Sequence, residues 1–596
     1  MKSILRLLAV LVVPAMSYST LLAQEVAYRI GWGSPNSHLY DVEMRFQNPE
    51  NGPVSVRIPA WRPGRYVIQN YAKNIIRFSA SDGEGTALAF RKTDKGTWEI
   101  DAAPSQEVVV SYQAYSKELN GGSSYLDDQE AYINPITLLM YIPGQEMLPV
   151  TLSVKRPDGW KAATQLAFDS RRNLYLADNY HEVVDGPLII SPTLELHSFE
   201  FAGATFEVAI QGSLEADRQQ LLQDLQKIAE VQVNMMGVIP FDRYVFLYHF
   251  VDQPIGHGVE HKNSTSIVLG PPSKPDFYKG ILSVSAHELF HAWNVERIRP
   301  EAIYYPDYSS EQYTTTFWIY EGVTSYYTSL TLVRSGLITE DEFLRRIAGS
   351  INSFESSYGK NVTSIAMSSW DSWTKGEQAP PNTYFSFYTA GEIIGLLLDM
   401  EVRGRTRNRQ SLESVMQYLY AEYAARGRGV PEDGLQRAIE TITTGTIAPF
   451  FEAHIHGTEQ IEYDRYLYHA GYRLAVTEDP NVPSVTLGIQ LAEGQNDVVI
   501  SSVVPESAAF EAGLYADDAL IALNGRRVTQ ANLNDVLDDI EPGQTVAATI
   551  FRRNQLQTIQ IPTRGGGNSK YELVRLPDTS TLQNQTRRDW MNLAAG

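Results

Sequence analysis

Apolar and polar residues alternate through much of the first third of the chain. Residues 54–58 (VSVRI) and 107–112 (EVVVSY) follow the two-residue period of a strand with one buried face. Turn signals separate such stretches, as at Asn51-Gly52-Pro53 and Pro63-Gly64. The pattern predicts a β-rich N-terminal domain over residues 24–198.

The pattern becomes helical near Ser213. Residues 214–236 are rich in helix formers, and Ser213 followed by Asp217 is a helix start signal. Residues 244–250 (YVFLYHF) predict a buried strand, and mostly helical patterns continue to about residue 470. We expect a second, mostly helical domain over residues 199–472.

Strand patterns return between residues 474 and 563. Residues 499–509 (VISSVVPESAA), then Ala512-Gly513-Leu514 and 518–525 (DALIALNG), resemble a bacterial PDZ domain, although Asp517 stands where Gly is frequent. Residues 487–489 (LGI) resemble the loop whose backbone N–H groups bind a chain terminus or an extended peptide. The same fold could instead pack on its neighbour and bind nothing. Three glycines at 565–567 predict a flexible linker and tail over 564–596.

Composition narrows the possible functions. The chain has 596 residues, enough for three or four domains, and its net charge of −21 argues against nucleic acid or anionic lipid as partners. It has no cysteine, which excludes disulfides and a thiol nucleophile.

The first residues have the pattern of a targeting segment. Lys2 and Arg6 precede an apolar stretch, 7–13, and a small-residue site near Ala23. This predicts a signal peptide over residues 1–23 and a periplasmic or secreted protein. The apolar stretch is too short for a membrane span, although an uncleaved anchor is the alternative.

The strongest chemical signal is the run 287–291 (HELFH). Residues 283–298 contain no Gly or Pro, and Pro300 follows, so we expect a helix there. Positions four apart share a helix face, so His287 and His291 can hold adjacent corners of a tetrahedral zinc site. Glu288 can then reach a water at the metal as a general base. Alternatively, both histidines are only hydrogen-bonded within a buried helix.

A third ligand lies thirty residues further on. Glu321 is embedded in 318–327 (WIYEGVTSYY), and an unpaired carboxylate among such apolar neighbours would be costly. Catalytic zinc usually keeps three protein ligands and one open position. The sequence therefore predicts one Zn²⁺ per chain, held by His287, His291 and Glu321, although Glu321 alone could be a solvated helix carboxylate.

Residues 287–300 (HELFHAWNVERIRP) and 318–327 together resemble the glycyl aminopeptidase family, M61, which are zinc-dependent gluzincins related to aminopeptidase N. The resemblance implies a multidomain α+β protein with an N-terminal β-rich domain, a thermolysin-like, mostly helical catalytic domain and a C-terminal PDZ domain. Residues 59–66 (PAWRPGRY) resemble a stretch of the family's N-terminal domain. They would border the substrate cleft or form a structural turn around a packed Trp.

The resemblance also implies a substrate anchor. Residues 256–261 (GHGVEH) resemble the G-x-M-E-N signature of related aminopeptidases, with Val259 and His261 as departures. Carried over, Gly258 and Glu260 bind the substrate, and the Glu260 carboxylate pairs with its free α-amine. The alternative for Glu260 is an ordinary strand carboxylate, and His257 and His261 have at most supporting roles.

Residues 387–391 (FYTAG) resemble the family's Tyr-x-Lys-Gly stretch, with Ala390 replacing Lys. Tyr388 would donate a hydrogen bond to the oxyanion, with Tyr384 and Tyr327 as alternatives. Three residues could orient the metal ligands: Asn294, Ser325 and Glu296.

These features together predict a zinc aminopeptidase that acts on peptide substrates. A preference for small N-terminal residues such as Gly or Ala is implied by the resemblance alone. Two alternatives remain: an endopeptidase of the same chemistry, to which the PDZ domain presents chains, and a peptide-binding scaffold with a vestigial zinc site.

Overall fold

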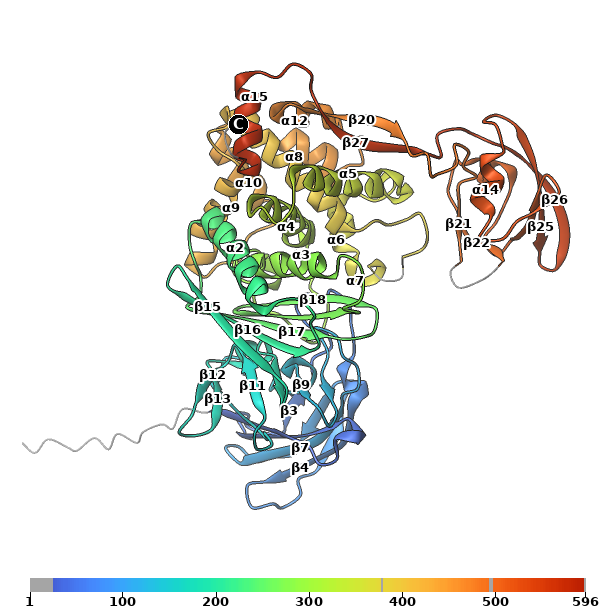
Figure 1. Cartoon of the computed structure of the whole chain (residues 1–596). Coiled ribbons are helices and arrows are strands. Elements are labelled where there is room, and N and C mark those ends of the chain that lie inside the picture. Colours follow the sequence, from blue (N-terminus) through green and yellow to red (C-terminus); the bar gives the residue numbers. More distant parts are fainter. Residues whose placement is uncertain (1–24, 377–378, 493–496, 594–596) are drawn as a thin grey trace, which may run out of the picture.

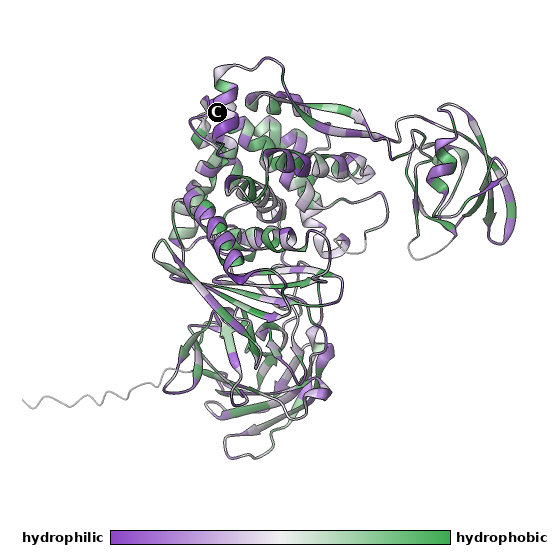
Figure 2. Cartoon of the chain, viewed as in Figure 1, coloured by the Kyte–Doolittle hydropathy of each residue, from purple (hydrophilic) through white to green (hydrophobic). Residues whose placement is uncertain are grey.

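The computed structural model describes residues 25–376, 379–492 and 497–593. The predicted signal peptide, 1–23, lies outside the described residues. Figure 1 shows a β-rich part, a twisted sheet covered by helices, and a separate β-rich module joined by a two-stranded arm. Figure 2 shows apolar positions interspersed with polar ones in all three parts. The predicted multidomain α+β fold is confirmed.

The N-terminal part is built around a seven-stranded sheet with the order β12-β13-β10-β1-β2-β7-β4. Its longest pairing is antiparallel, between β2 (Leu39–Gln47) and β7 (Glu107–Tyr115). Its other strands are β1 (Val26–Gly31), β4 (Ile75–Asp82), β10 (Val150–Val154), β12 (Ala167–Asp169) and β13 (Leu174–Ala177). Two smaller sheets comprise β3 (Val54–Arg57), β5 (Phe90–Lys92), β6 (Thr97–Ile100), β8 (Tyr125–Leu126), β9 (Ala131–Ile133), β11 (Lys161–Thr164) and β14 (Leu188–Ser191).

A five-stranded sheet with the order β15-β16-β17-β19-β18 links this part to the helices. The predicted buried strand is β17 (Arg243–Phe250), which has a parallel neighbour on each side. Its alternating side chains pack into two different apolar clusters, so both faces of the strand are covered. The other strands are β15 (Glu195–Phe201), β16 (Ala204–Gly212), β18 (Ile255–His261) and β19 (Ser264–Gly270). Strand β18 forms one edge of the sheet.

The helices pack over this sheet. Helix α2 (Arg218–Met236) begins where the Asp217 side chain accepts from the backbone N–H of Gln219. The site is built from α3 (Phe277–Phe290), the π-helical turn η5 (Trp318–Gly322), α4 (Val323–Arg334), α5 (Glu340–Ser356) and α8 (Phe387–Thr406). Further helices of this part are α6 (Ile365–Trp370), α7 (Ser372–Lys375), α9 (Leu412–Glu422), α10 (Gly434–Thr443), α11 (Ala448–Phe450) and α12 (Tyr463–Leu467). The short helix α1 (Tyr180–Val184) packs instead on β10 and β13 of the N-terminal part.

The helix expected over 283–298 begins earlier and ends earlier, because α3 stops at Phe290. Beyond it, the N–H of Glu296 donates to the carbonyl of His291, and the N–H of Ile298 donates to that of Trp293. These wider turns replace the helical ladder. His291 still has helical angles, φ −60° and ψ −21°, so it shares a face with His287.

The β-rich module has its own apolar core, separate from those of the other parts. It contains β21 (Ile489–Leu491), β22 (Val498–Val503), β23 (Ala519–Leu523), β24 (Arg526–Arg527), β25 (Thr545–Arg552), β26 (Gln555–Pro562), α13 (Ala508–Ala512) and α14 (Leu533–Asp538). The arm that joins it to the helices is β20 (Tyr472–Glu478) paired with β27 (Ser569–Arg575) along their full lengths.

The expected flexible tail, 564–596, is wrong for residues 569–591. After β27 the chain forms α15 (Thr581–Met591), whose Trp590 and Met591 are fully buried in the helical core. The Trp590 ring N–H donates to the Tyr326 hydroxyl at 2.8 Å, and Arg334 Nε donates to the Trp590 carbonyl at 2.8 Å. Gln583 and Thr586 are buried as well, so one face of this mostly polar helix packs on the helical core.

Throughout the described ranges, no helix has both the length and the hydropathy needed to cross a bilayer.

Candidate active site

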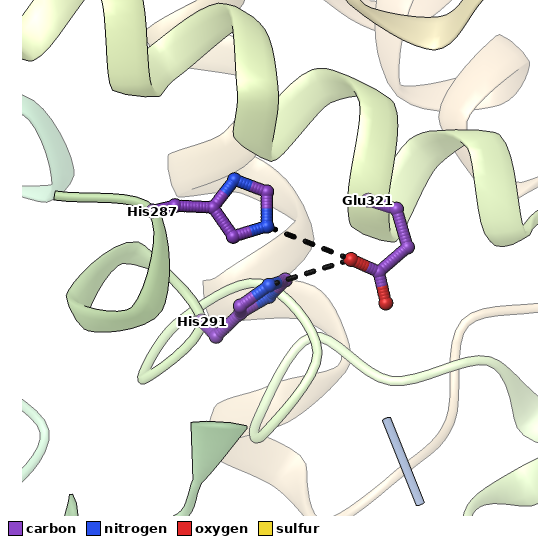
Figure 3. A group of neighbouring side chains, drawn as sticks. All are labelled: His287, His291 and Glu321. Atoms are coloured by element: carbon purple, nitrogen blue, oxygen red, sulfur yellow. Dashed lines mark ion pairs between the residues drawn. The ribbon is translucent and has the colours of Figure 1, made fainter. Parts of the chain in front are cut away.

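Two helices bring His287, His291 and Glu321 together. The histidines lie in the last turn and at the end of α3, with ring centroids 4.7 Å apart. Glu321 enters from η5, and its Oε2 lies 3.7 Å from His287 Nε2 and 3.5 Å from His291 Nε2 (Figure 3). All three side chains therefore point at one small volume.

This arrangement fits a zinc ion. One ligand atom from each residue lies within 4.8 Å of the other two. The N–O distances exceed those of ordinary hydrogen bonds and approach the separation of about 3.3 Å between ligands of a tetrahedral zinc. Glu321 is buried, and its Oε1 has no hydrogen-bond partner in the described part of the chain. A buried carboxylate left this way is satisfied by a cation.

Contacts behind the two histidines orient their rings. His291 Nδ1 lies 2.7 Å from the Asn294 carbonyl oxygen, and His287 Nδ1 lies 3.3 Å from Thr328 Oγ1. The Thr328 hydroxyl donates to the Thr324 carbonyl at 2.9 Å, which leaves it a lone pair for the His287 N–H. Both rings therefore direct Nε2 toward the proposed metal.

The sequence predicted only some of the residues that contact the proposed ligands from behind. Asn294 takes part through its carbonyl, while Ser325 donates to the Glu321 carbonyl at 2.9 Å. Glu296 pairs with Arg299 at 2.8 Å, so it does not orient a ligand. Thr328 was missed, although it lies seven residues after Glu321, and a helix returns to the same face after seven residues.

Two close contacts fix η5 relative to its neighbours. Asn294 Nδ2 donates to the Ile319 carbonyl and to Thr324 Oγ1, both at 3.0 Å, which joins the end of α3 to η5 and α4. On the other side, a Cβ on Gly391 would lie 2.3 Å from the Trp318 carbonyl oxygen. Helix α8 therefore approaches η5 backbone to backbone.

Glu288 and Glu260 lie beside the proposed metal site. Both are buried, and atoms of Glu260, Glu288 and His291 lie within 4.8 Å of one another. A Cβ on Gly258 would lie 2.2 Å from Glu288 Oε1, so only glycine leaves room for this carboxylate. Burial raises the pKa of Glu288 to about 8 and the pKa of Glu260 to about 7.

The N-terminal part covers Glu260. A Cβ on Gly64 would lie 2.6 Å from each carboxylate oxygen of Glu260, and Tyr66 stacks on Phe317 with ring centroids 3.5 Å apart. Trp61 is fully buried and donates to the Asp307 carbonyl at 2.8 Å. The segment 59–66 thus contains both the packed Trp and a wall of the cleft.

Of the three tyrosines considered from the sequence, Tyr388 lies beside the histidines. Its ring is nearly parallel to that of His287, with centroids 6.4 Å apart, and it is 37% exposed. Desolvation of its hydroxyl, together with the Glu321 carboxylate, keeps the Tyr388 pKa well above its ordinary value, so the hydroxyl remains a donor. Tyr384 donates to the Ser368 carbonyl, and Tyr327 stacks on Phe290.

The two other histidines of 256–261 belong to the boundary with the N-terminal part. His257 Nδ1 accepts from the Gly121 N–H at 3.1 Å, and His261 Nδ1 lies 2.9 Å from Asp185 Oδ1.

The chain matches three family models. Residues 27–192 match the peptidase M61 N-terminal domain, residues 280–394 match the M61 glycyl aminopeptidase, and residues 485–563 match a PDZ domain.

Solved structures are similar as well. An aminopeptidase N family protein from Idiomarina loihiensis is 27% identical, with a TM-score of 0.86 over 95% of this chain and 100% of that one. An M1 zinc metallopeptidase from Deinococcus radiodurans is 14% identical, with a TM-score of 0.45 over 70% of this chain and 90% of that one.

Among curated proteins, the regulator of sigma-E protease RseP from Escherichia coli (strain K12) is 33% identical over 132 residues. The match spans 22% of this chain and 27% of RseP. The two M61 matches cover the N-terminal part and the HELFH helix, and the PDZ match follows them along the chain. The chain therefore carries an M61 N-terminal domain at residues 27–192, an M61 glycyl aminopeptidase domain at residues 280–394 and a C-terminal PDZ domain at residues 485–563.

Proposed function

We propose that this protein is a zinc-dependent aminopeptidase that removes the N-terminal residue of peptides. The observation that carries the proposal is Glu260, a buried carboxylate beside the metal ligands. Its Oε1 has no hydrogen-bond partner among the residues described. A substrate ammonium would satisfy that oxygen through a charge-assisted hydrogen bond.

Each residue of the site would have a distinct role in peptide hydrolysis. His287, His291 and Glu321 would hold one Zn²⁺, which supplies Lewis-acid chemistry that polarises the scissile carbonyl and lowers the pKa of the attacking water. Glu288 accepts the water proton on a carboxylate oxygen and passes it to the leaving amine. The Tyr388 hydroxyl donates to the developing oxyanion.

The covering of Glu260 favours an aminopeptidase over an endopeptidase. With Gly64 packed against the carboxylate, a chain that continued past the ammonium would meet the N-terminal part. Glu260 also lines a cavity of about 350 Å³, whose charged side chains of both signs include Arg62, Glu296 and Arg299. The preference for Gly or Ala rests on family resemblance.

The test is Glu260→Gln, assayed on a peptide with a free N-terminus and on its acetylated form. Losing the charged anchor costs about 1.5–3 kcal/mol, so we expect kcat/KM to fall by about 10–150-fold on the free peptide alone. Glu84→Gln, on an exposed loop, is the matched control. Equal losses on both peptides would instead indicate an endopeptidase.

Zinc content is measured on the same samples. Bound zinc without hydrolysis of any peptide would favour the scaffold alternative. Activity that survives chelation would exclude zinc chemistry.

The route to the periplasm or the exterior is also a proposal, and it rests on the leader pattern of residues 1–23. N-terminal sequencing of the mature protein tests it, with cleavage after Ala23 expected. We propose that the PDZ domain receives a peptide terminus or an extended chain at residues 487–489.

A further inference from the structure

A second cavity lies at the opposite end of β18 from Glu260. Its volume is about 1160 Å³, and it is lined by Ile255 and Gly256 of β18, by the loop that leads into α3, and by parts of α3 and α5. Neither the metal ligands nor Glu288 line it.

One face of β18 leads from the metal ligands to this cavity. Side chains alternate along a strand, so Gly256, Gly258 and Glu260 share a face. Glu260 marks the position of the ammonium, and Gly258 lies against the general base, Glu288. Gly256, one step further, lines the cavity. A substrate anchored at Glu260 and cleaved beside Glu288 therefore runs toward the cavity with its C-terminal part.

Helix α3 and the free edge of β18 also indicate that the substrate chain runs from Glu260 toward the cavity. Ser283 lies one turn before His287 and Gly280 lies about two turns before it, and both line the cavity. Strand β18 pairs with β19 on one side, and within the described ranges no backbone hydrogen bond occupies its other edge. That edge can accept an antiparallel peptide.

The cavity carries an excess of positive charge. Its lining includes four cations, Lys274, Lys279, Arg345 and Arg346, but only two carboxylates, Asp276 and Glu342. Lys279 pairs with both carboxylates, at 3.7 Å and 2.8 Å. In the parts of the chain that the structure describes, the other three cations form no ion pair.

Arg346 is the best placed of these cations. It is half-buried, and its NH1 donates to Ser283 Oγ at 3.2 Å, on the α3 face that continues to His287. Lys274 and Arg345 are exposed. In a chain with a net charge of −21, this local excess of positive charge favours an anionic ligand.

We propose that this cavity binds the C-terminal carboxylate of the peptide substrate, so that short peptides with free C-termini are favoured. The proposal rests on the aminopeptidase function proposed above, which places the ammonium at Glu260. From Glu260 to Gly256 an extended chain advances about 13 Å at ~3.3 Å per residue. Peptides of about four or five residues would therefore place their carboxylate at Arg346.

The first test varies peptide length and terminus. Peptides of the form Gly-(Ala)n, two to seven residues long, are assayed as C-terminal acids and as amides. A charge-assisted hydrogen bond predicts an acid-to-amide ratio in kcat/KM of about 10 or more at four or five residues, and a lower ratio at other lengths. A ratio that does not change with length overturns the proposal.

The carboxylate that binds in this cavity could also come from an acidic side chain of the peptide. An amidated pentapeptide with Glu at its fourth position tests this source. If Glu restores the rate lost on amidation, the cavity accepts side-chain carboxylates as well as the terminus. If only the terminal acid is favoured, the terminus is the ligand.

Substitutions in the cavity then test whether its side chains cause the preference for the C-terminal acid over the amide. Arg346→Gln should bring the acid-to-amide ratio at five residues close to one, and Arg346→Lys should retain part of it. Lys274→Gln combined with Arg345→Gln changes exposed positions only, and it should also lower the ratio. The matched control is Lys95→Gln, an exposed cation on the N-terminal part, which should leave the ratio at its original value. A ratio unaffected by all cavity variants contradicts the proposal.

Binding measurements test the carboxylate site separately from the aminopeptidase function on which it rests. Calorimetry with the Glu288→Gln protein compares the acid and amide pentapeptides without turnover. Tighter binding of the acid that is lost in Arg346→Gln supports the cavity even if no peptide is hydrolysed by the unmodified enzyme. Hydrolysis without any preference for the acid would leave the aminopeptidase in place and overturn the carboxylate site.

Discussion

At the scale of single residues, the contacts behind the proposed metal ligands determine how precisely their side chains are oriented. Thr328 is the contact that fixes His287, because its hydroxyl is already committed as a donor to Thr324. The imidazole is then held as the tautomer that donates from Nδ1. Removing the hydroxyl frees the ring without altering any proposed ligand.

Thr328→Val should therefore weaken zinc binding by about 10–100-fold, the usual effect of losing such a partner. Competition with a chelator measures the affinity. Thr441→Val, at an exposed position of α10, is the matched control. Unchanged affinity in Thr328→Val would show that another group orients His287.

A second pair of buried groups lies where the N-terminal part meets the central sheet. Glu130 Oε2 is 3.6 Å from His249 Nε2, and both side chains are buried. Burial, with Asp127 nearby, raises the pKa of Glu130 from 4.5 to about 8. Burial lowers the pKa of His249 to about 3. Both groups are therefore held in their neutral forms.

This raised pKa predicts how stability depends on pH. The unfolded chain releases the Glu130 proton near its ordinary pKa of 4.5, while the folded protein keeps it until about pH 8. The stability that Glu130 contributes is thus full below pH 4.5 and is lost as the pH rises toward 8. Glu130→Gln cannot ionise and should not show this loss.

We expect the difference in free energy of unfolding, variant minus wild type, to grow from pH 5 to pH 8 and then level off. Urea unfolding at each pH measures it. The depressed pKa of His249 costs stability as the pH falls below about 6.5, but both proteins share that term. Asp128→Asn, an exposed neighbour, should give a flat difference. A flat difference for Glu130→Gln would mean that Glu130 is ionised in the folded protein.

At the scale of elements, the site depends on how closely α8 approaches η5. The contact is made through Gly322 and Gly391, where a Cβ on Gly322 would lie 2.3 Å from the Gly391 Cα. Glu321 of η5 and Tyr388 of α8 both lie beside the histidines, so the contact fixes their relative positions. A side chain at this contact has no room unless a helix moves.

Gly391→Ala should therefore lower both the stability and the rate, because it displaces η5 and with it Glu321. Gly349→Ala, in α5, meets nothing within 4 Å and should stabilise the protein by about 1 kcal/mol through helix propensity. Thermal unfolding and kcat on a dipeptide compare the two. Equal behaviour of the two variants would show that α8 shifts at no cost.

At the scale of the whole molecule, the PDZ domain is an insertion between two paired strands. Strands β20 and β27 run side by side from Tyr472↔Arg575 to Glu478↔Ser569, and α15 then returns to the helical core. The catalytic part therefore needs residues from both sides of the PDZ domain. Cutting the chain after Glu478 would remove Trp590, a fully buried side chain.

Replacing residues 479–568 with Asn-Gly, a turn suited to a two-residue hairpin, should leave a folded enzyme that binds zinc and cleaves dipeptides. A chain truncated after Glu478 should be strongly destabilised, since loss of a buried Trp alone costs about 3–5 kcal/mol. Thermal unfolding, zinc content and dipeptide hydrolysis distinguish them. Loss of dipeptide hydrolysis in the excised protein would show that the PDZ domain forms part of the active-site wall.

Local patterns were enough to predict much of this protein. The four-residue spacing of His287 and His291 needs only one turn of helix, and the apolar setting of Glu321 marked it as a candidate ligand. The strand periods and the run at 244–250 predicted the β-rich part and the buried strand. Each of these properties belongs to one short segment, so it can be read from neighbouring positions.

Only the tertiary structure placed Gly64 against Glu260, Thr328 behind His287, and α15 in the helical core. It also gathered Lys274 and Arg346 at the far end of β18, where the sequence separates them by more than seventy residues. These contacts join segments far apart in the chain, and no local period encodes them. They form when the apolar faces of distant segments pack together, because that packing determines which side chains become neighbours in the site.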